Sequence, residues 1–465
     1  MRLAVVVQRY GLEINGGAEL HARYVAEHLA PHAEVEVLTT CARDYVTWRN
    51  ALAPGIERIN GVPVRRFPVA KERDTLRFAR LSTMVFDEPH SLDDELEWLD
   101  AEGPTSPALV EHASKHAADF DFFIVFSYRY YTAYHVIRAV GPKAVLVPTA
   151  ERDPAIGLTI FGRIFRDVRA LMYNSPEERA MIRAVSHNES VPSVVVGVGS
   201  EIPAHVQPMA FRQKYDLHDP FVVYIGRIDQ NKGCQQLFDW FDAYLRAAAG
   251  RLTLVLIGQS LLPVPQHPRI LHLGYLSDED KFNAIAAAEL LVMPSYFESL
   301  SMVALEAWAL GRPVLANGAC DVLKGQCIRS NAGLYYENVG EFVETLRTLE
   351  RTAWLAAALG RNGRRFYRDQ YDWPVIERKY LAMVASLPPT SAVSREEDRG
   401  WRERRRPGCP AASTVLAGLP AGWARDANAP AEQALSTLSN RSPLTRPVRP
   451  EQGRTEGSSH GPAGA

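Results

Sequence analysis

Two glutamates, Glu298 and Glu306, stand eight positions apart where an apolar run gives way to a helical pattern. The run, Leu290–Met293, predicts a buried strand that ends at Pro294 and leads through a loop into a helix. The helical sequence around Glu306 is apolar on nearly all sides. A carboxylate there is expected to be buried or to face a cleft, where it needs donors such as the two hydroxyls of a ribose. Glu298, in the loop, can hold sugar hydroxyls or a developing positive charge.

The start of the same helix offers backbone amides without a partner inside the helix. Ser299, Leu300 and Ser301 precede its first turn. Helix N-termini favour phosphate, because the free N–H groups and the helix dipole both attract negative charge. In open α/β sheets ligands bind beyond the carboxyl ends of the strands. This strand-loop-helix unit therefore predicts a site for a phosphorylated ligand.

A second unit of the same kind carries two cations. The segment FVVYIGRIDQNKGCQQLFDWF places Gly226, Arg227 and Lys232 between an apolar run and an amphipathic helix. A guanidinium and an ammonium there can stabilise the charge that a diphosphate gathers as its bond to a sugar breaks. The alternative is a pair of surface cations, which the positive end of the helix dipole disfavours.

Gly16 and Gly17 follow the first predicted strand and open the first predicted helix. Backbone without side chains can approach a phosphate closely. A tight strand-to-helix turn explains the same pair of residues equally well. The glycines therefore indicate phosphate binding only in combination with the other motifs.

Alternating strand-like and helix-like segments predict an α/β protein with two domains. The first domain is expected at residues 1–203 and the second at 204–365, with a hinge near 199–206 and terminal helices at 366–387. Residues 388–465 are rich in Pro, Gly, Ala, Ser and Arg and have no sustained apolar periodicity. That stretch is predicted to be disordered, because it cannot offset the entropy of ordering.

The composition argues against several functional classes. The chain has 52 Lys and Arg against 54 Asp and Glu, without the basic excess that is usual in nucleic-acid-binding proteins. Its five cysteines show neither the CxxC pairing of a zinc site nor a disulfide framework, which favours a reducing cytoplasm. The apolar start is short and predicts a strand rather than a signal peptide. No apolar run is long enough to cross a membrane.

Three motifs together resemble the retaining family 4 glycosyltransferases of the GT-B fold: Gly16-Gly17, Arg227 with Lys232, and Glu298-x7-Glu306. The similarity extends to about Leu387 and is most specific in YFESLSMVALEAWALGRPV. It implies an α/β GT-B fold, in which two Rossmann-like domains face each other across a cleft. The second domain would hold most of a nucleotide-sugar, and the last helices would cross back onto the first domain.

The resemblance also implies roles for single residues. Arg227 and Lys232 would neutralise the diphosphate, Glu306 would bind the ribose and Glu298 the donor sugar. Gly17 would contact the phosphate, and the base would rest against the loop at Tyr275 and Leu276. The donor-binding residues expected in this way are Gly16, Gly17, Gly226, Tyr275, Leu276, Ser299, Leu300, Ser301 and Glu306.

One position departs from the pattern. Many relatives have a histidine near the reacting sugar where this chain has Glu151, followed by Arg152 and Asp153. A carboxylate can orient a sugar or accept the acceptor's proton, so Glu151 or Asp153 can replace the histidine, and Glu151 joins Glu298, Arg227 and Lys232 as a catalytic candidate. The missing histidine also suits a catalytically weak or inactive nucleotide-sugar-binding protein, which is the alternative.

The leading hypothesis is transfer of a sugar from a UDP- or GDP-sugar to an acceptor hydroxyl with retention, in the synthesis of polysaccharide, lipopolysaccharide or another glycoconjugate. No Asp-x-Asp motif lies at a strand end, so neither a metal nor a cofactor beyond the nucleotide-sugar co-substrate is expected. An epimerase or a phosphorylase on this fold is less favoured. The glutamate pair fits transfer better, and nothing suggests a cofactor-binding lysine.

The acceptor side is expected in the first domain, at the acidic insertion of residues 71–116 and the aromatic run of residues 126–135. The acceptor can be a saccharide, a lipid-linked molecule or a small molecule. A lipid-linked acceptor would bring this cytoplasmic protein to the inner membrane face.

Overall fold

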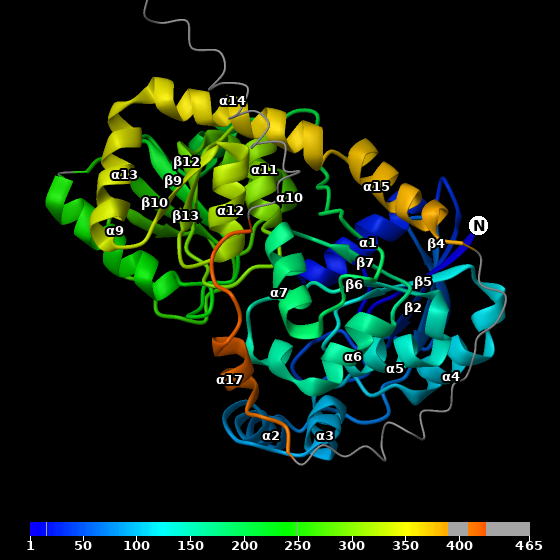
Figure 1. Ribbon diagram of the computed structural model, residues 1–465. Helices are drawn as coiled ribbons and strands as arrows, with labels where there is room; N and C mark the ends of the chain where they lie inside the picture. Colours follow the sequence, from blue (N-terminus) through cyan, green and yellow to red (C-terminus); the bar gives the residue numbers. More distant parts are fainter. Residues whose placement is uncertain (15, 249, 389–407, 425–465) are drawn as a thin grey trace, which may run out of the picture. The chain divides into compact units, whose positions relative to one another are not determined.

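The computed structural model describes residues 1–14, 16–248, 250–388 and 408–424. The described residues belong to one compact unit, Met1–Asp426. It contains an eight-stranded sheet from the first half of the chain and a six-stranded sheet from the second (Figure 1).

The first sheet has the order β3-β4-β2-β1-β5-β6-β7-β8, and its neighbouring strands are parallel except for β3 and β4. Its central strands are apolar and buried along nearly their whole length, as in parallel sheets covered by helices on both faces. The strands are Arg2–Val6 (β1), Glu34–Thr40 (β2), Gly55–Ile59 (β3), Val62–Phe67 (β4), Phe122–Phe126 (β5), Ala144–Val147 (β6), Ala170–Tyr173 (β7) and Ser193–Val195 (β8).

The helices of this half connect the strands or lie in the insertion between β4 and β5. They are Gly17–Leu29 (α1), Thr75–Asp87 (α2), Leu92–Glu102 (α3), Pro107–Lys115 (α4), Tyr131–Val140 (α5), Thr159–Asp167 (α6), Pro176–Ser186 (α7) and Pro208–Lys214 (α8). Three short 3-10 turns accompany them: Ala117–Asp119 (η1), Gly141–Lys143 (η2) and Pro154–Gly157 (η3).

The second sheet is wholly parallel, in the order β11-β10-β9-β12-β13-β14. Its strands are Phe221–Ile225 (β9), Thr253–Ile257 (β10), Ile270–His272 (β11), Leu290–Met293 (β12), Val314–Asn317 (β13) and Gly333–Tyr336 (β14). The accompanying helices are Cys234–Ala248 (α9), Asp278–Ala287 (α10), Met302–Ala309 (α11), Asp321–Ser330 (α12), Val339–Arg351 (α13), Ala353–Gln370 (α14) and Trp373–Ser386 (α15).

Each sheet reverses its strand order at one point, between β1 and β5 in the first and between β9 and β12 in the second. The carboxyl ends of two strands leave a crevice at such a point, and ligands bind there. The loops after β1, β5, β9 and β12 carry Gly16-Gly17, Arg129, Lys232 and Glu298 respectively. The topology thus gathers residues that are far apart in the sequence.

The last long helix, α15, packs on the first half of the chain, against α1 and β8 (Figure 1). The Trp373 indole stacks on the His28 ring with 3.7 Å between ring centroids, and the Tyr380 hydroxyl lies 3.0 Å from His21 Nε2. The chain therefore returns to its first sheet after completing its second.

Part of the stretch predicted to be disordered is ordered. Residues 408–424 include the short helix α17 (Ala412–Ala417), which packs against η3 and α2 (Figure 1). The prediction of disorder is wrong for these residues, because a few small apolar side chains such as Ala412 are buried against the first half of the chain. Such a cluster has no periodicity that a sequence pattern can show. Residues 389–407 and 425–465 of the predicted tail lie outside the described residues.

Within the described residues, no helix is both long and apolar enough to span a membrane.

Candidate active site

Loops from both sheets line one cavity of about 1030 Å³. All the single residues predicted for catalysis or donor binding line it, except Ser301 and Glu306, whereas no residue of the insertion 71–116 does. The predicted residues that line it are Gly16, Gly17, Glu151, Gly226, Arg227, Lys232, Tyr275, Leu276, Glu298, Ser299 and Leu300.

The loop between β9 and α9 is held against the end of β12 by a glycine. Gly233 has a φ of +70°, and a Cβ on it would lie 2.1 Å from the carbonyl oxygen of Pro294. Only glycine allows this approach. Because Lys232 precedes Gly233, its ammonium reaches the loop after β12 and donates a hydrogen bond to Glu298, with 2.8 Å between Nζ and Oε1.

The two cations of this loop each face a carboxylate. Lys232 Nζ is bound to Glu298, and Arg227 Nε donates to Asp229. Burial lowers the pKa of Lys232, but the nearby carboxylates of Glu298 and Glu151 outweigh burial and raise it. The ammonium is therefore fully charged at neutral pH. Arg227 also donates from Nη1 to the Tyr45 hydroxyl, 3.1 Å away, in the first half of the chain.

Glu306 lies beneath the cavity rather than on its wall. Glu306 is 2% exposed, and its Oε1 accepts hydrogen bonds from Ser200 (2.8 Å) and Lys281 (3.0 Å). The other oxygen, Oε2, is buried and has no partner among the described residues. Burial was expected for this carboxylate. Its contact with a ribose stays a prediction; its partner Lys281 lines the cavity, whereas Glu306 itself does not.

Ser301 has a structural position at the start of α11. Its hydroxyl accepts a hydrogen bond from the Ala304 amide, as N-cap residues do. The residue is buried, and the neighbouring Ser299 and Leu300 face the cavity in its place.

The loop after β1 presents bare backbone to the cavity. A Cβ on Gly17 would meet no atom within 4 Å, so space for a ligand group lies beside it. Gly16 instead lies against the side chains of Glu19 and Arg9. These two side chains form a buried ion pair, with Arg9 Nε 2.9 Å from Glu19 Oε1.

Arg129, in the loop after β5, lies between two carboxylates. Its Nε is 2.9 Å from Glu102 Oε1, and its Nη1 is 2.6 Å from Asp153 Oδ2. Arg73 binds the other oxygen of Glu102 at 2.8 Å. Asp153 is therefore engaged within the protein, although it also lines the cavity.

The carboxylate of Glu151 lines the cavity and makes no hydrogen bond or ion pair with the described part of the chain. Its pKa is raised to about 7, mainly by burial; the charge of Lys232 opposes this rise, and the carboxylates of Glu298 and Asp153 add to it. Of the two acidic residues that could stand in for the histidine, Glu151 is thus the one with a free carboxylate and a pKa suited to proton transfer near neutrality.

The sequence did not single out several residues of the cavity wall, among them Arg9, Arg129 and Lys281. Arg129 lies within the aromatic run that was noted for its tyrosines, so a charge inside an apolar run was the available signal. Lys281 sits in an ordinary acidic helix start, DEDKF, and no sequence signal marks it.

The part of the chain that forms the second sheet is similar to a known protein family. Residues 219–351 match the family model described as Glycosyl transferases group 1. This part of the chain is a glycosyl transferases group 1 domain. The domain contains Arg227, Lys232, Glu298 and Glu306, whereas Gly17 and Glu151 lie outside the matched residues.

Solved structures show that the glycosyltransferase domain is part of a GT-B fold. Sucrose-phosphate synthase from Thermosynechococcus elongatus covers 83% of this chain and 98% of its own, with a TM-score of 0.61 at 18% identity. HepE from Anabaena, solved with UDP and glucose, covers 83% and 99%, with a TM-score of 0.61 at 16% identity. The predicted fold class, α/β of GT-B type, is confirmed, with two sheets in place.

A curated relative with sequence similarity is mannosylfructose-phosphate synthase from Agrobacterium fabrum. It is 28% identical over 217 residues, which are 41% of this chain and 45% of that protein. The chain thus spans less than half the length of this relative.

Proposed function

We propose that this protein is a glycosyltransferase that moves a sugar from a UDP- or GDP-sugar to an acceptor hydroxyl with retention of the anomeric configuration. One observation supports it most strongly. Arg227 and Lys232 face the same cavity as Gly17, Glu298 and Glu151. Cations suit a diphosphate, bare backbone suits a phosphate oxygen, and carboxylates suit sugar hydroxyls. HepE from Anabaena has also been solved with UDP-glucose, which is a donor of this class.

Donor binding rearranges the Lys232–Glu298 pair. A diphosphate carries more negative charge than a single carboxylate and draws the ammonium toward it. Glu298 is then released to accept hydrogen bonds from the donor sugar. One ion pair in the cavity is thereby exchanged for two contacts with the substrate, so the exchange favours binding.

In the transfer step the acceptor oxygen forms a bond to the anomeric carbon, and the bond from that carbon to the diphosphate breaks. Glu151 accepts the acceptor's proton, while Arg227 and Lys232 stabilise the charge that develops on the leaving diphosphate. Within this scheme protein cations do the work that a divalent metal does in other transferases. We assign the acceptor a saccharide, lipid-linked or small-molecule hydroxyl and place the reaction in cytoplasmic glycoconjugate synthesis.

The test is a product assay on the full chain with UDP-glucose, GDP-mannose and related donors against a panel of hydroxyl acceptors. We expect release of one nucleoside diphosphate and formation of a glycosylated product only when an acceptor is present. The anomeric configuration of the product, read by NMR, should match that of the donor. A product of inverted configuration would contradict the retaining mechanism but leave the proposed sugar transfer standing.

Two other outcomes would replace the proposal. Binding of a donor without turnover on any acceptor would make the protein a non-catalytic nucleotide-sugar-binding protein. Conversion of the donor without an acceptor would make it an epimerase.

A further inference from the structure

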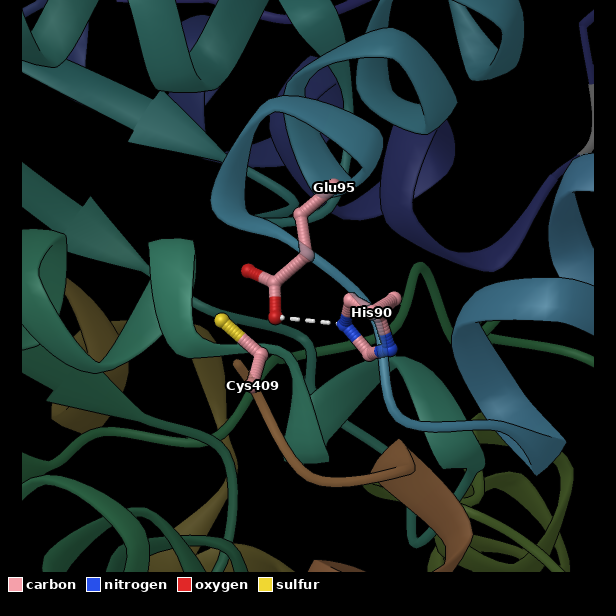
Figure 2. A group of neighbouring side chains, drawn as sticks. All are labelled: His90, Glu95 and Cys409. Carbon is pink, nitrogen blue, oxygen red and sulfur yellow. Dashed lines mark hydrogen bonds and ion pairs between the residues drawn. The ribbon is translucent and has the colours of Figure 1, made fainter. Parts of the chain in front are cut away.

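Outside the cavity, three potential metal ligands meet where the C-terminal segment packs on the first half of the chain: His90, Glu95 and Cys409 (Figure 2). Their ligand atoms all lie within 4.8 Å of one another, and all three residues are buried. His90 precedes α3 and Glu95 lies in its first half, whereas Cys409 comes from the C-terminal segment 408–424. His90 and Cys409 form an isolated antiparallel β-bridge, in which the backbone amide of each residue donates a hydrogen bond to the carbonyl oxygen of the other.

The hydrogen bonds of His90 require a proton or a metal cation next to its Nε2. Its Nδ1 lies 2.8 Å from the carbonyl oxygen of Glu88, and because a carbonyl only accepts, Nδ1 must carry the hydrogen. In a neutral ring Nε2 then presents a lone pair, 3.0 Å from Glu95 Oε1. Two acceptors facing each other need either a proton or a metal cation between them.

Glu95 has no cationic side-chain partner other than His90 in the described part of the chain. Its oxygens accept hydrogen bonds from the Thr159 amide (2.9 Å) and the Ile160 amide (2.8 Å) at the start of α6. These bonds fix the carboxylate and leave further lone pairs free for a ligand. The carbonyl of Glu88 fixes the His90 tautomer in the same way. Such outer hydrogen bonds are typical of metal-binding histidines and carboxylates.

We propose that His90 Nε2, a Glu95 oxygen and Cys409 Sγ bind a zinc ion, with water as the fourth ligand. Nitrogen, oxygen and thiolate ligands in a buried site suit zinc better than magnesium or calcium. Tetrahedral zinc places its ligand atoms about 3.5 Å apart. Because the three ligand atoms already lie within 4.8 Å of one another, the Cys409 sulfur needs to approach by at most about 1 Å. Binding displaces the thiol proton of Cys409 and any proton between His90 and Glu95, and it changes no oxidation state.

The ion would fasten residues 408–424 to the first half of the chain. That segment lies next to the loop that carries Glu151: Arg152 donates hydrogen bonds to the carbonyl oxygens of Leu419 (2.9 Å) and Pro420 (2.7 Å). Gly157, at the end of η3, is packed so closely that a Cβ on it would lie 2.3 Å from the Ala412 carbonyl oxygen. The site therefore has a structural role rather than a place in the transfer reaction.

Cobalt provides the direct test, because Co²⁺ takes the place of zinc and absorbs light when a thiolate binds it. The full, untagged chain is freed of metal with a chelator and titrated with Co²⁺. We expect one ion per chain, a sulfur-to-cobalt charge-transfer band, and loss of the band when Zn²⁺ is added. Cys409→Ser should abolish the band. Cys327→Ser, a matched change at another buried cysteine that lies in the second half of the chain, should keep it.

Absence of the band in the wild-type chain would overturn the proposal, whatever the variants do. Survival of the band in a folded Cys409→Ser variant would also overturn it, because the cobalt would then be bound elsewhere. A second readout uses hydrogen exchange, in which Zn²⁺ should slow exchange in residues 408–424 relative to the chelated protein. Equal exchange with and without Zn²⁺ would also contradict the proposed fastening.

Discussion

The two sides of the cavity hold their cations in different ways. On the side of the second sheet, Lys232 is hydrogen-bonded to a single carboxylate, Glu298, through a flexible side chain. On the side of the first sheet, Arg129 donates hydrogen bonds from two nitrogens, one to Glu102 and one to Asp153. Arg73 binds the other carboxylate oxygen of Glu102. A cation with one partner can exchange it for a diphosphate. A cation fixed by two carboxylates is part of the framework.

The difference predicts where a substitution harms catalysis and where it harms folding. Substitution of Lys232, on the side of the second sheet, should lower turnover and change the free energy of unfolding little. Substitution of Arg129, on the side of the first sheet, should lower the free energy of unfolding first.

Removing the ammonium of Lys232 should give the largest effect. Lys232→Ala takes away charge that stabilises the leaving diphosphate, so kcat should fall by about two orders of magnitude, or roughly 3 kcal/mol. Steady-state kinetics with the donor identified in the product assay measure this. Lys324→Ala is a suitable control, because Lys324 also pairs with a glutamate, Glu337, in the same half of the chain but does not line the cavity. Normal turnover of Lys232→Ala would remove Lys232 from the mechanism.

Arg129→Met should mainly weaken the fold. The change leaves Asp153 without its cation and Glu102 with one cation in place of two, so the free energy of unfolding should fall by about 2 kcal/mol. Denaturant unfolding measures the change, with Arg163→Met as the control, since Arg163 forms an i,i+4 pair with the exposed Asp167. If Arg129→Met kept full stability and lost turnover as Lys232→Ala does, the proposed contrast between the two sides would fail.

Glu151 gives a prediction on pH. Its pKa of about 7 in the folded chain is above the usual value, so between these values the folded state binds more protons than the unfolded state. The carboxyl group therefore lowers stability progressively as the pH rises toward 7. Glu151→Gln should remove that loss and stabilise the chain, relative to wild type, by on the order of 1 kcal/mol more at pH 8 than at pH 4. Unfolding curves at both pH values should reveal it.

The same variant tests the role of Glu151 in transfer. For a carboxylate that accepts a proton, the wild-type kcat/KM should rise through about pH 7, and Glu151→Gln should lack this rise. A wild-type profile that is flat across neutral pH would argue against Glu151 as the base.

The smallest effect is expected at the contact between the two sides. Tyr45→Phe removes the hydroxyl that accepts a hydrogen bond from Arg227. A single exposed hydrogen bond contributes about 0.5–1 kcal/mol, so the KM for the donor should rise only a few-fold, with kcat nearly unchanged. A loss as large as that of Lys232→Ala would mean that the first half takes part in charge stabilisation.

Much of this fold could be predicted from apolar runs and their turn signals. The buried strands Phe221–Ile225 and Leu290–Met293 lie where the sequence placed them. Two of the strands that the sequence analysis missed, Gly55–Ile59 and Gly333–Tyr336, lie at a sheet edge, where a strand needs no continuous apolar run. The strand Ala170–Tyr173 was also missed, although it is buried.

The candidate site was predictable where one loop carries its own signal. Arg227 and Lys232 lie in a single strand-loop-helix unit, and the family resemblance pointed to the same residues. The ion pair of Arg9 with Glu19 and the neighbourhood of Arg129 depend on contacts between distant segments, which no local pattern records. The same holds for Cys409, whose neighbours His90 and Glu95 come from the other end of the chain.

Thermal unfolding of the full chain with UDP, GDP and ADP tests the central claim most directly, namely that the cations of the second sheet's loop bind a nucleoside diphosphate. One diphosphate should raise the Tm selectively, since a ligand at 100 times its Kd stabilises by about 2.7 kcal/mol. The rise should shrink strongly in Arg227→Ala and persist in Lys324→Ala. If none of the three diphosphates changes the Tm of the wild-type chain, the cavity is not a nucleotide-sugar site.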